Sequence, residues 1–108
     1  MADLPSLVQL VLEGLLAYGP EKVILFGSFA RGDADEFSDI DLIVIKETSQ
    51  RFVQRLVEVM AFIPREVAAD VLVYTPQEFQ AMVEVDNPFI EQALKDGIVL
   101  YEKAPGNG

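Results

Sequence analysis

The chain has 108 residues, 51% of them apolar, and carries a net charge of −10 from 18 acidic and 8 basic residues. It contains neither cysteine nor histidine, which excludes disulfides, zinc sites built on either residue, and catalysis by a thiolate or an imidazole. Because stable binding to nucleic acid depends on Lys and Arg that neutralise phosphates, we do not expect it from this chain alone. Carboxylates remain as the groups for acid–base and metal chemistry.

The length predicts one domain with one core, which we place at residues 1–103, followed by a disordered tail at 104–108. No apolar run approaches the roughly 18 residues that a membrane span requires. The N-terminus has no basic region before an apolar one, so a signal peptide is not predicted. We therefore expect a cytoplasmic protein without membrane attachment.

Apolar residues recur at helical spacing between Leu4 and Leu15, and the dipeptide Gly19-Pro20 ends the predicted helix. We interpret this apolar stripe as a surface that packs on a sheet, although it would also suit a partner protein. The next segment, Glu21–Phe26, is predicted to be a strand. Its unbroken apolar run, Val23–Phe26, is typical of a strand buried on both faces.

A glycine turn follows this strand, with the sequence Gly27-Ser28-Phe29-Ala30-Arg31-Gly32. Gly27 is explained most simply by a tight turn that needs a positive φ angle. Ser28 could simply cap a short helix, and its hydroxyl and the free N–H groups at a helix start also suit phosphate oxygens. Arg31 lies one helical turn further on, where a structural salt bridge is the plainest use for it. The acidic segment 33–36 is interpreted as a solvated loop.

Two carboxylates open the next predicted strand, Ser38–Ile45. Asp39 and Asp41 alternate along it, so both point to one face. Exposure on an edge strand explains the pair poorly, because aspartate is unfavourable in strands and the following run Leu42–Ile45 is apolar. Adjacent carboxylates repel each other unless a cation lies between them, and Mg²⁺ is commonly held by one or two carboxylates plus substrate phosphates. A phosphate-binding turn beside a metal pair indicates nucleotide chemistry.

The next predicted helix starts at Thr48 or Ser49 and ends at Pro64. We place Arg51 and Arg55 on its exposed outer side. Its buried stripe is predicted to consist of six apolar residues: Phe52, Val53, Leu56, Val57, Met60 and Ile63.

The third predicted strand is Ala68–Tyr74, with Asp70 at its start. Asp70 could be a satisfied polar residue at the mouth of a strand. If this strand pairs with the second one, Asp70 instead joins Asp39 and Asp41 on one face. The remaining predicted elements are a helix capped by Thr75 and Glu78, a helix from Asn87-Pro88 to about Asp96, and a short edge strand at Ile98–Tyr101.

The combination of Gly27-Ser28, a spacer from Phe29 to Ser38, and Asp39-Ile40-Asp41 resembles the nucleotidyltransferase superfamily related to DNA polymerase beta. More narrowly, it looks like the minimal nucleotidyltransferases, which are small stand-alone versions of that fold, and the resemblance covers nearly the whole chain. It implies an α/β (α+β) nucleotidyltransferase fold, with a mixed sheet of three or four strands and helices packed mostly on one face.

The resemblance also implies a metal-dependent transfer of a nucleoside monophosphate, with AMP from ATP as the expected group and Mg²⁺ or Mn²⁺ as the cofactor. Asp70 is then also expected to take the proton of the acceptor. The implied site consists of Gly27, Ser28, Arg31 and Ser38 for the nucleotide, and of Asp39, Asp41 and Asp70 for metal binding and catalysis.

Because the chain stops after the minimal core, we expect an oligomer or a partner to hold the acceptor. Minimal family members often occur with a helical HEPN-type protein, a ribonuclease toxin that the nucleotidyltransferase neutralises by binding or by AMP transfer. We therefore expect a HEPN-type partner or a homo-oligomer, with ATP or another nucleoside triphosphate as ligand. The alternatives are a catalytically silent domain that neutralises a partner by association alone, and a subunit that adenylylates an antibiotic.

Overall fold

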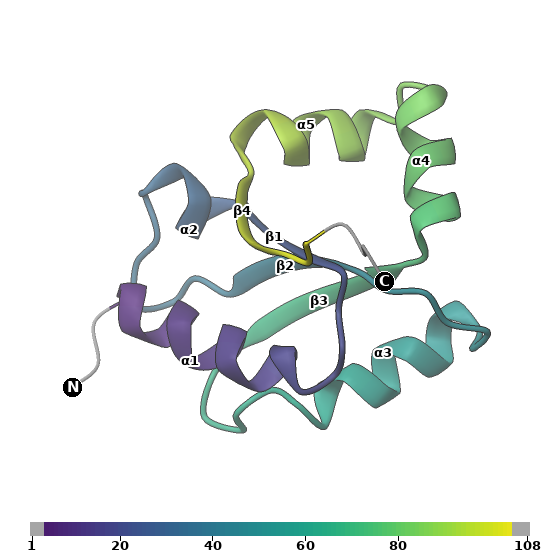
Figure 1. The fold of residues 1–108 in the computed structure, drawn as a ribbon. Coiled ribbons are helices and arrows are strands. Elements are labelled where there is room, and N and C mark those ends of the chain that lie inside the picture. The colour runs from purple at the N-terminus through teal and green to yellow at the C-terminus, as the bar shows by residue number, and fades with distance from the viewer. Residues whose placement is uncertain (1–3, 105–108) are drawn as a thin grey trace.

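The computed structural model describes residues 4–104, in which five helices surround a single sheet (Figure 1). Within this range, no helix is both long and apolar enough to cross a membrane. The tail predicted at 104–108 lies outside the described residues apart from Ala104. In chain order the elements are α1 (Leu4–Leu16), β1 (Lys22–Phe26), α2 (Ser28–Arg31), β2 (Ile40–Ile45), α3 (Phe52–Met60), β3 (Ala69–Tyr74), α4 (Pro76–Glu84), α5 (Pro88–Asp96) and β4 (Ile98–Glu102).

The four strands form a mixed sheet with the order β3-β2-β1-β4. Strand β1 pairs antiparallel with both β2 and β4, whereas β2 pairs parallel with β3. The mixed sheet and the edge position of the last strand confirm the sequence predictions. Because β2 and β3 are parallel and β1 runs against them, the starts of β2 and β3 lie beside the end of β1. The predicted motif residues therefore meet at one end of the sheet.

The helices cover both faces of the sheet, where the resemblance implied that most would lie on one (Figure 1). The physical reason is that the central strands β1 and β2 are apolar on both faces, so neither face can be left to water without cost. Helices α1 and α3 cover one face, and α4 and α5 cover the other. The first core includes Val11, Leu15, Leu25, Leu42 and Val59, and the second consists of Ile24, Ile43, Ile45, Ile90 and Ala93.

Helix α3 is rotated relative to the sequence prediction. Three residues predicted to be buried are largely exposed: Val53 (69%), Val57 (67%) and Met60 (50%). Arg55, predicted to be exposed, is instead 5% exposed. The prediction was wrong because the Arg55 guanidinium is bound to Glu78 of α4, and this contact turns the arginine side of the helix inward.

Most other local predictions are confirmed. Thr75 and Glu78 form a capping box at the start of α4, and the Asn87 side chain caps α5. Several boundaries differ, most by one residue, and α3 ends at Met60 where Pro64 was predicted. Helix α3 has Arg51 at its N-cap, with no capping side chain, and β2 begins at Ile40, so Asp39 lies just before the strand.

Candidate active site

The turn after β1 brings the backbone against the start of β2. Gly27 has a φ angle of 75°, in the left-handed region that favours glycine. A Cβ atom at this position would collide with the carboxylate of Asp41. Gly27 is therefore required both for the backbone conformation and for the close approach of the carboxylate to the turn.

The β2–β3 register places two of the predicted carboxylates side by side. Asp41 pairs with Asp70 in the parallel β2–β3 ladder and with Phe26 in the antiparallel ladder to β1. Asp39 lies two residues before Asp41, just ahead of the strand, and its charge acts on Asp41. Because Ile43 follows Asp41 by two residues and packs in the core that α5 covers, Asp41 and its partner Asp70 lie on the α5 face of the sheet.

The three carboxylates are electrostatically coupled. Burial, followed by repulsion from Asp70 and from Asp39, raises the pKa of Asp41 above its usual value, and the Arg31 guanidinium lowers it in part. Asp41 is half-buried, whereas Asp39 and Asp70 are exposed. The ionised form of Asp41 is thus disfavoured in the protein alone, and a nearby cation would stabilise it.

The donor chemistry of this site fits a hard divalent cation, because every side chain in it offers carboxylate oxygens. Among the described residues, however, no group of three or more His, Cys, Asp or Glu side chains is arranged to hold a metal ion. Mg²⁺ commonly takes one or two protein carboxylates and completes its shell with water and substrate phosphates. The residues that would hold such an ion are Asp41 and Asp70, with Asp39 beside them.

Two cavities meet at Asp41. The first, which we call the motif cavity, has a volume of about 350 Å³ and is lined by the Gly27-Ser28 turn, Arg31 and α5. The second, the strand-edge cavity, has a volume of about 530 Å³ and is lined by Asp70 and by mostly apolar residues of β3 and α3. Asp41 lines both, together with Phe26 and Phe89. Two ligands could therefore approach Asp41 from different sides.

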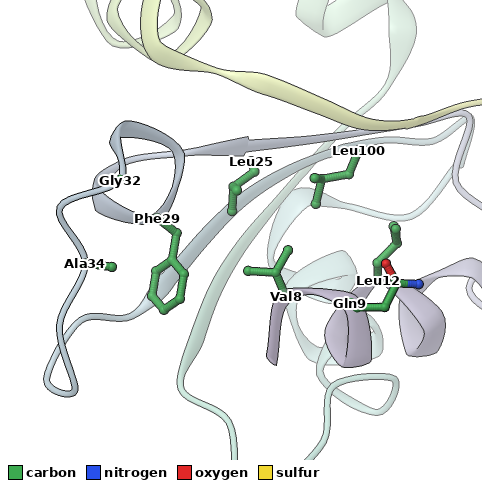
Figure 2. A pocket seen from close by; sticks show the side chains of 8 residues that line it. All are labelled: Val8, Gln9, Leu12, Leu25, Phe29, Gly32, Ala34 and Leu100. Carbon is green, nitrogen blue, oxygen red and sulfur yellow. The ribbon is translucent and has the colours of Figure 1, made fainter. Parts of the chain in front are cut away.

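A further cavity, of about 480 Å³, lies on the opposite face of the sheet (Figure 2). In Figure 2, Val8 of α1 and Phe29 of α2 extend into the space between their two helices, with Leu25 of β1 and Leu100 of β4 above them in the view. None of the residues that line this cavity is charged. Because phosphates require cationic or N–H partners, this cavity does not suit a nucleotide, and the candidate site is the one around Asp41.

Three of the four residues predicted to bind nucleotide line the motif cavity: Gly27, Ser28 and Arg31. The Arg31 side chain is 47% exposed and forms two loose ion pairs, at 3.4 Å to Asp33 and 3.9 Å to Asp96. Exposed ion pairs of this kind are weak. The guanidinium is therefore free to turn toward an anionic ligand.

Ser38 is placed differently from the other three. Its hydroxyl donates a hydrogen bond to Asp35 Oδ1 (3.1 Å) and accepts one from the Asp35 N–H (3.0 Å). It does not line the motif cavity. In this structure Ser38 closes the acidic loop before β2, and nucleotide binding by this residue stays a prediction.

Helix α5 contributes residues that the sequence reasoning did not single out. Phe89, Gln92 and Asp96 line the motif cavity opposite the turn. Their spacing of three and four residues places them on one helix face, and the Asn87 cap with Pro88 in the first turn fixes where that helix begins. That spacing is visible in the sequence, but it shows only that the three residues share a helix face.

Replacing Asp41 with asparagine should raise the melting temperature of the protein in the absence of divalent ions. The substitution removes a half-buried negative charge that burial, Asp70 and Asp39 all disfavour. Added Mg²⁺ and ATP should stabilise the natural protein more than the variant, because ligands stabilise the state to which they bind. Thermal unfolding in EDTA and in Mg²⁺-ATP measures both effects, and a variant that melts lower in EDTA would contradict this view of Asp41.

A mixed sheet with a glycine turn packed against paired strand carboxylates defines a nucleotidyltransferase-type domain. Comparison with protein families agrees: the family described as Polymerase beta, Nucleotidyltransferase matches residues 15–105, and the chain belongs to this family.

Two curated relatives come from Methanocaldococcus jannaschii, and both are named as candidate protein adenylyltransferases. One is 32% identical over 81 residues, which cover 75% of this chain and 78% of the relative. The other is 68% identical over 28 residues, or 25% of this chain and 28% of the relative. A crystal structure of a candidate nucleotidyltransferase from Sulfolobus solfataricus superimposes with a TM-score of 0.65, covering 94% of this chain and 82% of that one. At 24% identity, this last likeness concerns the fold alone.

Proposed function

We propose that the protein is a metal-dependent adenylyltransferase that moves AMP from ATP to a hydroxyl group of an acceptor protein. The observation that carries this proposal is the packing of the Gly27 turn against Asp41, which in turn pairs with Asp70. A phosphate-binding turn and a carboxylate pair are thereby brought to one point. The names of the two archaeal relatives support a protein as the acceptor.

In this proposal the triphosphate lies in the motif cavity. The turn at Gly27 leaves room for phosphate oxygens, and Ser28 offers a hydroxyl. The N–H groups of Ser28 and Phe29 precede the first helical hydrogen bonds, which Ala30 and Arg31 donate to the Gly27 carbonyl. Arg31 supplies a positive charge from the same short helix. Asp39 and Asp41, with Asp70, would hold Mg²⁺ or Mn²⁺, and the bound ion would supply positive charge to the phosphates and to the leaving pyrophosphate.

The acceptor approaches from the strand-edge cavity. Its hydroxyl oxygen forms a bond to the α-phosphorus while the bond from that phosphorus to the bridging oxygen breaks, and pyrophosphate leaves. The proton of the hydroxyl passes to the carboxylate of Asp70, which lines this cavity and is exposed.

The lining of the strand-edge cavity favours a protein acceptor. Leu56 and Met60 of α3 form part of it, and the exposed residues Val53 and Val57 continue the apolar surface along the same helix. An apolar patch beside a catalytic group suits a protein surface. A polycationic antibiotic would instead require mostly acidic walls, which argues against the antibiotic alternative.

We further propose that the acceptor is a helical HEPN-type toxin, which the protein neutralises as an antitoxin. This partner rests on the family resemblance, and the net charge of −10 would suit a basic partner. The exposed apolar stripe of α3 also favours the non-enzymatic alternative, in which association alone neutralises the partner. The two differ in whether AMP becomes covalently attached.

The test uses the protein isolated from its source cells together with its bound partners. It is incubated with Mg²⁺ and ATP that carries the label on the α-phosphate or, in a parallel sample, on the γ-phosphate. Nucleotidyl transfer predicts that only the α-label appears on the partner and that EDTA prevents it. Association of a partner without labelling would favour the binding alternative, and labelling from the γ-phosphate would overturn the proposal.

Replacing Asp70 with asparagine should lower AMP transfer on the order of 10²-fold, the range expected when general-base assistance is lost. ATP binding should persist, because Gly27, Ser28 and the Asp39–Asp41 pair are unchanged. The melting temperature should not fall, because Asp70 is exposed and its charge repels Asp41. Initial transfer rate, ATP affinity and melting temperature are measured on one preparation. A well-folded variant with normal transfer would remove Asp70 from the mechanism.

A further inference from the structure

Phe89 is an aromatic residue that α5 holds at the wall shared by the motif and strand-edge cavities. Its backbone N–H donates to the side chain of the capping residue Asn87 at 3.0 Å. Its ring contacts Phe26 in a T-shaped arrangement, with the centroids 5.5 Å apart and an interplanar angle of 85°. The ring is thus fixed in position, although the residue is 40% exposed.

Packing of α5 on the sheet accounts for only one side of this ring, the side that contacts Phe26. Ile90 and Ala93 bury the helix against the sheet and are 1% and 3% exposed. Leu94, on the same helix, has an exposure of 42% that is close to that of Phe89, yet it does not line the motif cavity. The distinguishing property of Phe89 is therefore a fixed, accessible aromatic surface inside the candidate site.

We propose that Phe89 is the platform on which the base of the bound nucleotide stacks. This inference rests on the proposed function, because it takes the triphosphate to lie on the Gly27-Ser28 turn with its α-phosphate near Asp41. The base must then lie against another wall of the motif cavity, and α5 forms the wall opposite the turn.

Among the α5 residues of this wall, Phe89 has the chemistry to bind the face of a base. Asp96 is acidic. It already accepts a hydrogen bond from the Gln92 side chain at 2.7 Å and forms an ion pair with Arg31. Ala93 is buried. Aromatic side chains bind any base through its π face, and this stacking is a main source of affinity at sites that read no particular sequence. Phe89 thus binds the nucleoside part, while the turn and the carboxylates bind the phosphates.

The test measures two ligands by calorimetry, each with Mg²⁺: ATP, and inorganic tripolyphosphate, which has no nucleoside. Replacing Phe89 with alanine should weaken ATP binding about 10-fold or more and leave tripolyphosphate binding unchanged. Phe89→Leu keeps an apolar side chain but has no ring, so it should bind ATP as poorly as the alanine variant. Phe89→Tyr keeps the ring and should bind ATP as the natural protein does.

Leu94→Ala serves as the matched control, because it removes a similarly exposed apolar side chain from the same helix. It should leave both affinities unchanged. A loss of ATP affinity in Leu94→Ala as well would show that the effect comes from the packing of α5 and not from the Phe89 ring. Full ATP affinity in Phe89→Ala or in Phe89→Leu would overturn the proposal, as would an equal loss of ATP and tripolyphosphate. If the natural protein binds neither ligand, the proposed function itself fails. This result differs from failure of the Phe89 proposal alone, in which the natural protein still binds both ligands.

Discussion

Replacing Gly27 with alanine should lower AMP transfer by about 10²-fold or more, which is the effect expected when a reacting group is displaced by about 1 Å. The new Cβ atom would occupy the place of the Asp41 carboxylate. Since that carboxylate is the movable end of a side chain, it should rotate away while the strand stays in place. Mg²⁺-dependent ATP binding should weaken in parallel, and calorimetry together with the labelled-ATP assay measures both losses.

Gly32 provides a matched control for this experiment. Its φ angle of 83° is close to that of Gly27, but a Cβ atom at Gly32 would meet no other atom within 4 Å. The two backbones differ in ψ, which is −155° at Gly27 and 13° at Gly32. Gly32→Ala should lose about 1–2 kcal/mol of stability for its left-handed backbone. Gly27→Ala should lose more, because its φ and ψ angles lie in a region that is essentially restricted to glycine. Only Gly27→Ala should lose transfer. Equal transfer per folded molecule by the two variants would show that the close approach of Gly27 to Asp41 has no role in the reaction.

Residues that are close in sequence or follow strict strand alternation made much of this site predictable. The glycine turn is local, and the alternation of Asp39 and Asp41 follows from strand geometry. The position of Asp70 beside Asp41 depended on one further assumption, that the second and third strands pair, and the parallel register confirms it. The motif, the turn and the strand period were enough to predict these positions, because each of them depends on residues that are close together in the chain.

Helix α3 shows where this reasoning fails. The apolar stripe through Val53 and Val57 has helical spacing, and period alone assigns such a stripe to the core. The opposite side carries Arg55, whose charge would ordinarily keep it in water. Its partner Glu78 is 23 residues away in the chain, and no pattern within the helix reveals that contact. A prediction based on period therefore selected the wrong face.

The residues of α5 were missed for a related reason. Phe89, Gln92 and Asp96 carry no recognisable motif, and their role depends on the position of α5 across the cavity from Gly27. That position is set by the packing of Ile90 and Ala93 on the sheet, which is a tertiary contact. Sequence spacing could show that the three residues share a helix face, but it could not show what the face opposes.

The buried Arg55 side chain joins several elements of the fold, and leaving its charge without a partner should have a large effect on stability. Its guanidinium donates to both carboxylate oxygens of Glu78, at 2.6 and 3.2 Å, and to the backbone oxygens of Gln50 and Val73. Through these bonds it joins α3 to the edge strand β3 and to the first turn of α4. Glu78 in turn accepts from the Thr75 N–H at 2.9 Å. The burial of the two partners differs, because the side chain of Arg55 is 6% exposed and that of Glu78 is 45% exposed.

This difference predicts that removing the acid costs more stability than removing the base. Glu78→Gln preserves an oxygen that can accept from Thr75 but leaves the guanidinium of Arg55 buried without a counter-charge. We expect a loss of about 2–3 kcal/mol in the free energy of unfolding. This is less than is typical for breaking a fully buried ion pair, because solvent reaches Glu78. Arg55→Met leaves the carboxylate of Glu78 in contact with water and should cost less. The double variant should be more stable than Glu78→Gln alone, since it no longer contains the unpaired charge.

The same pair predicts how the stability difference changes with pH. Hydrogen bonds from Arg55 and then from the Thr75 backbone hold the pKa of Glu78 below its usual value. A lowered pKa means that the carboxylate contributes stability at pH values above the pKa of the unfolded chain, and that this contribution is lost as the pH falls through the pKa of the folded protein. The difference in unfolding free energy between the natural protein and Glu78→Gln should therefore be full at neutral pH and shrink below about pH 4.3, the ordinary value for glutamate. Urea unfolding of both proteins at several pH values measures it, and a difference that stays constant into acid would show that the ion pair does not stabilise the fold through its charge.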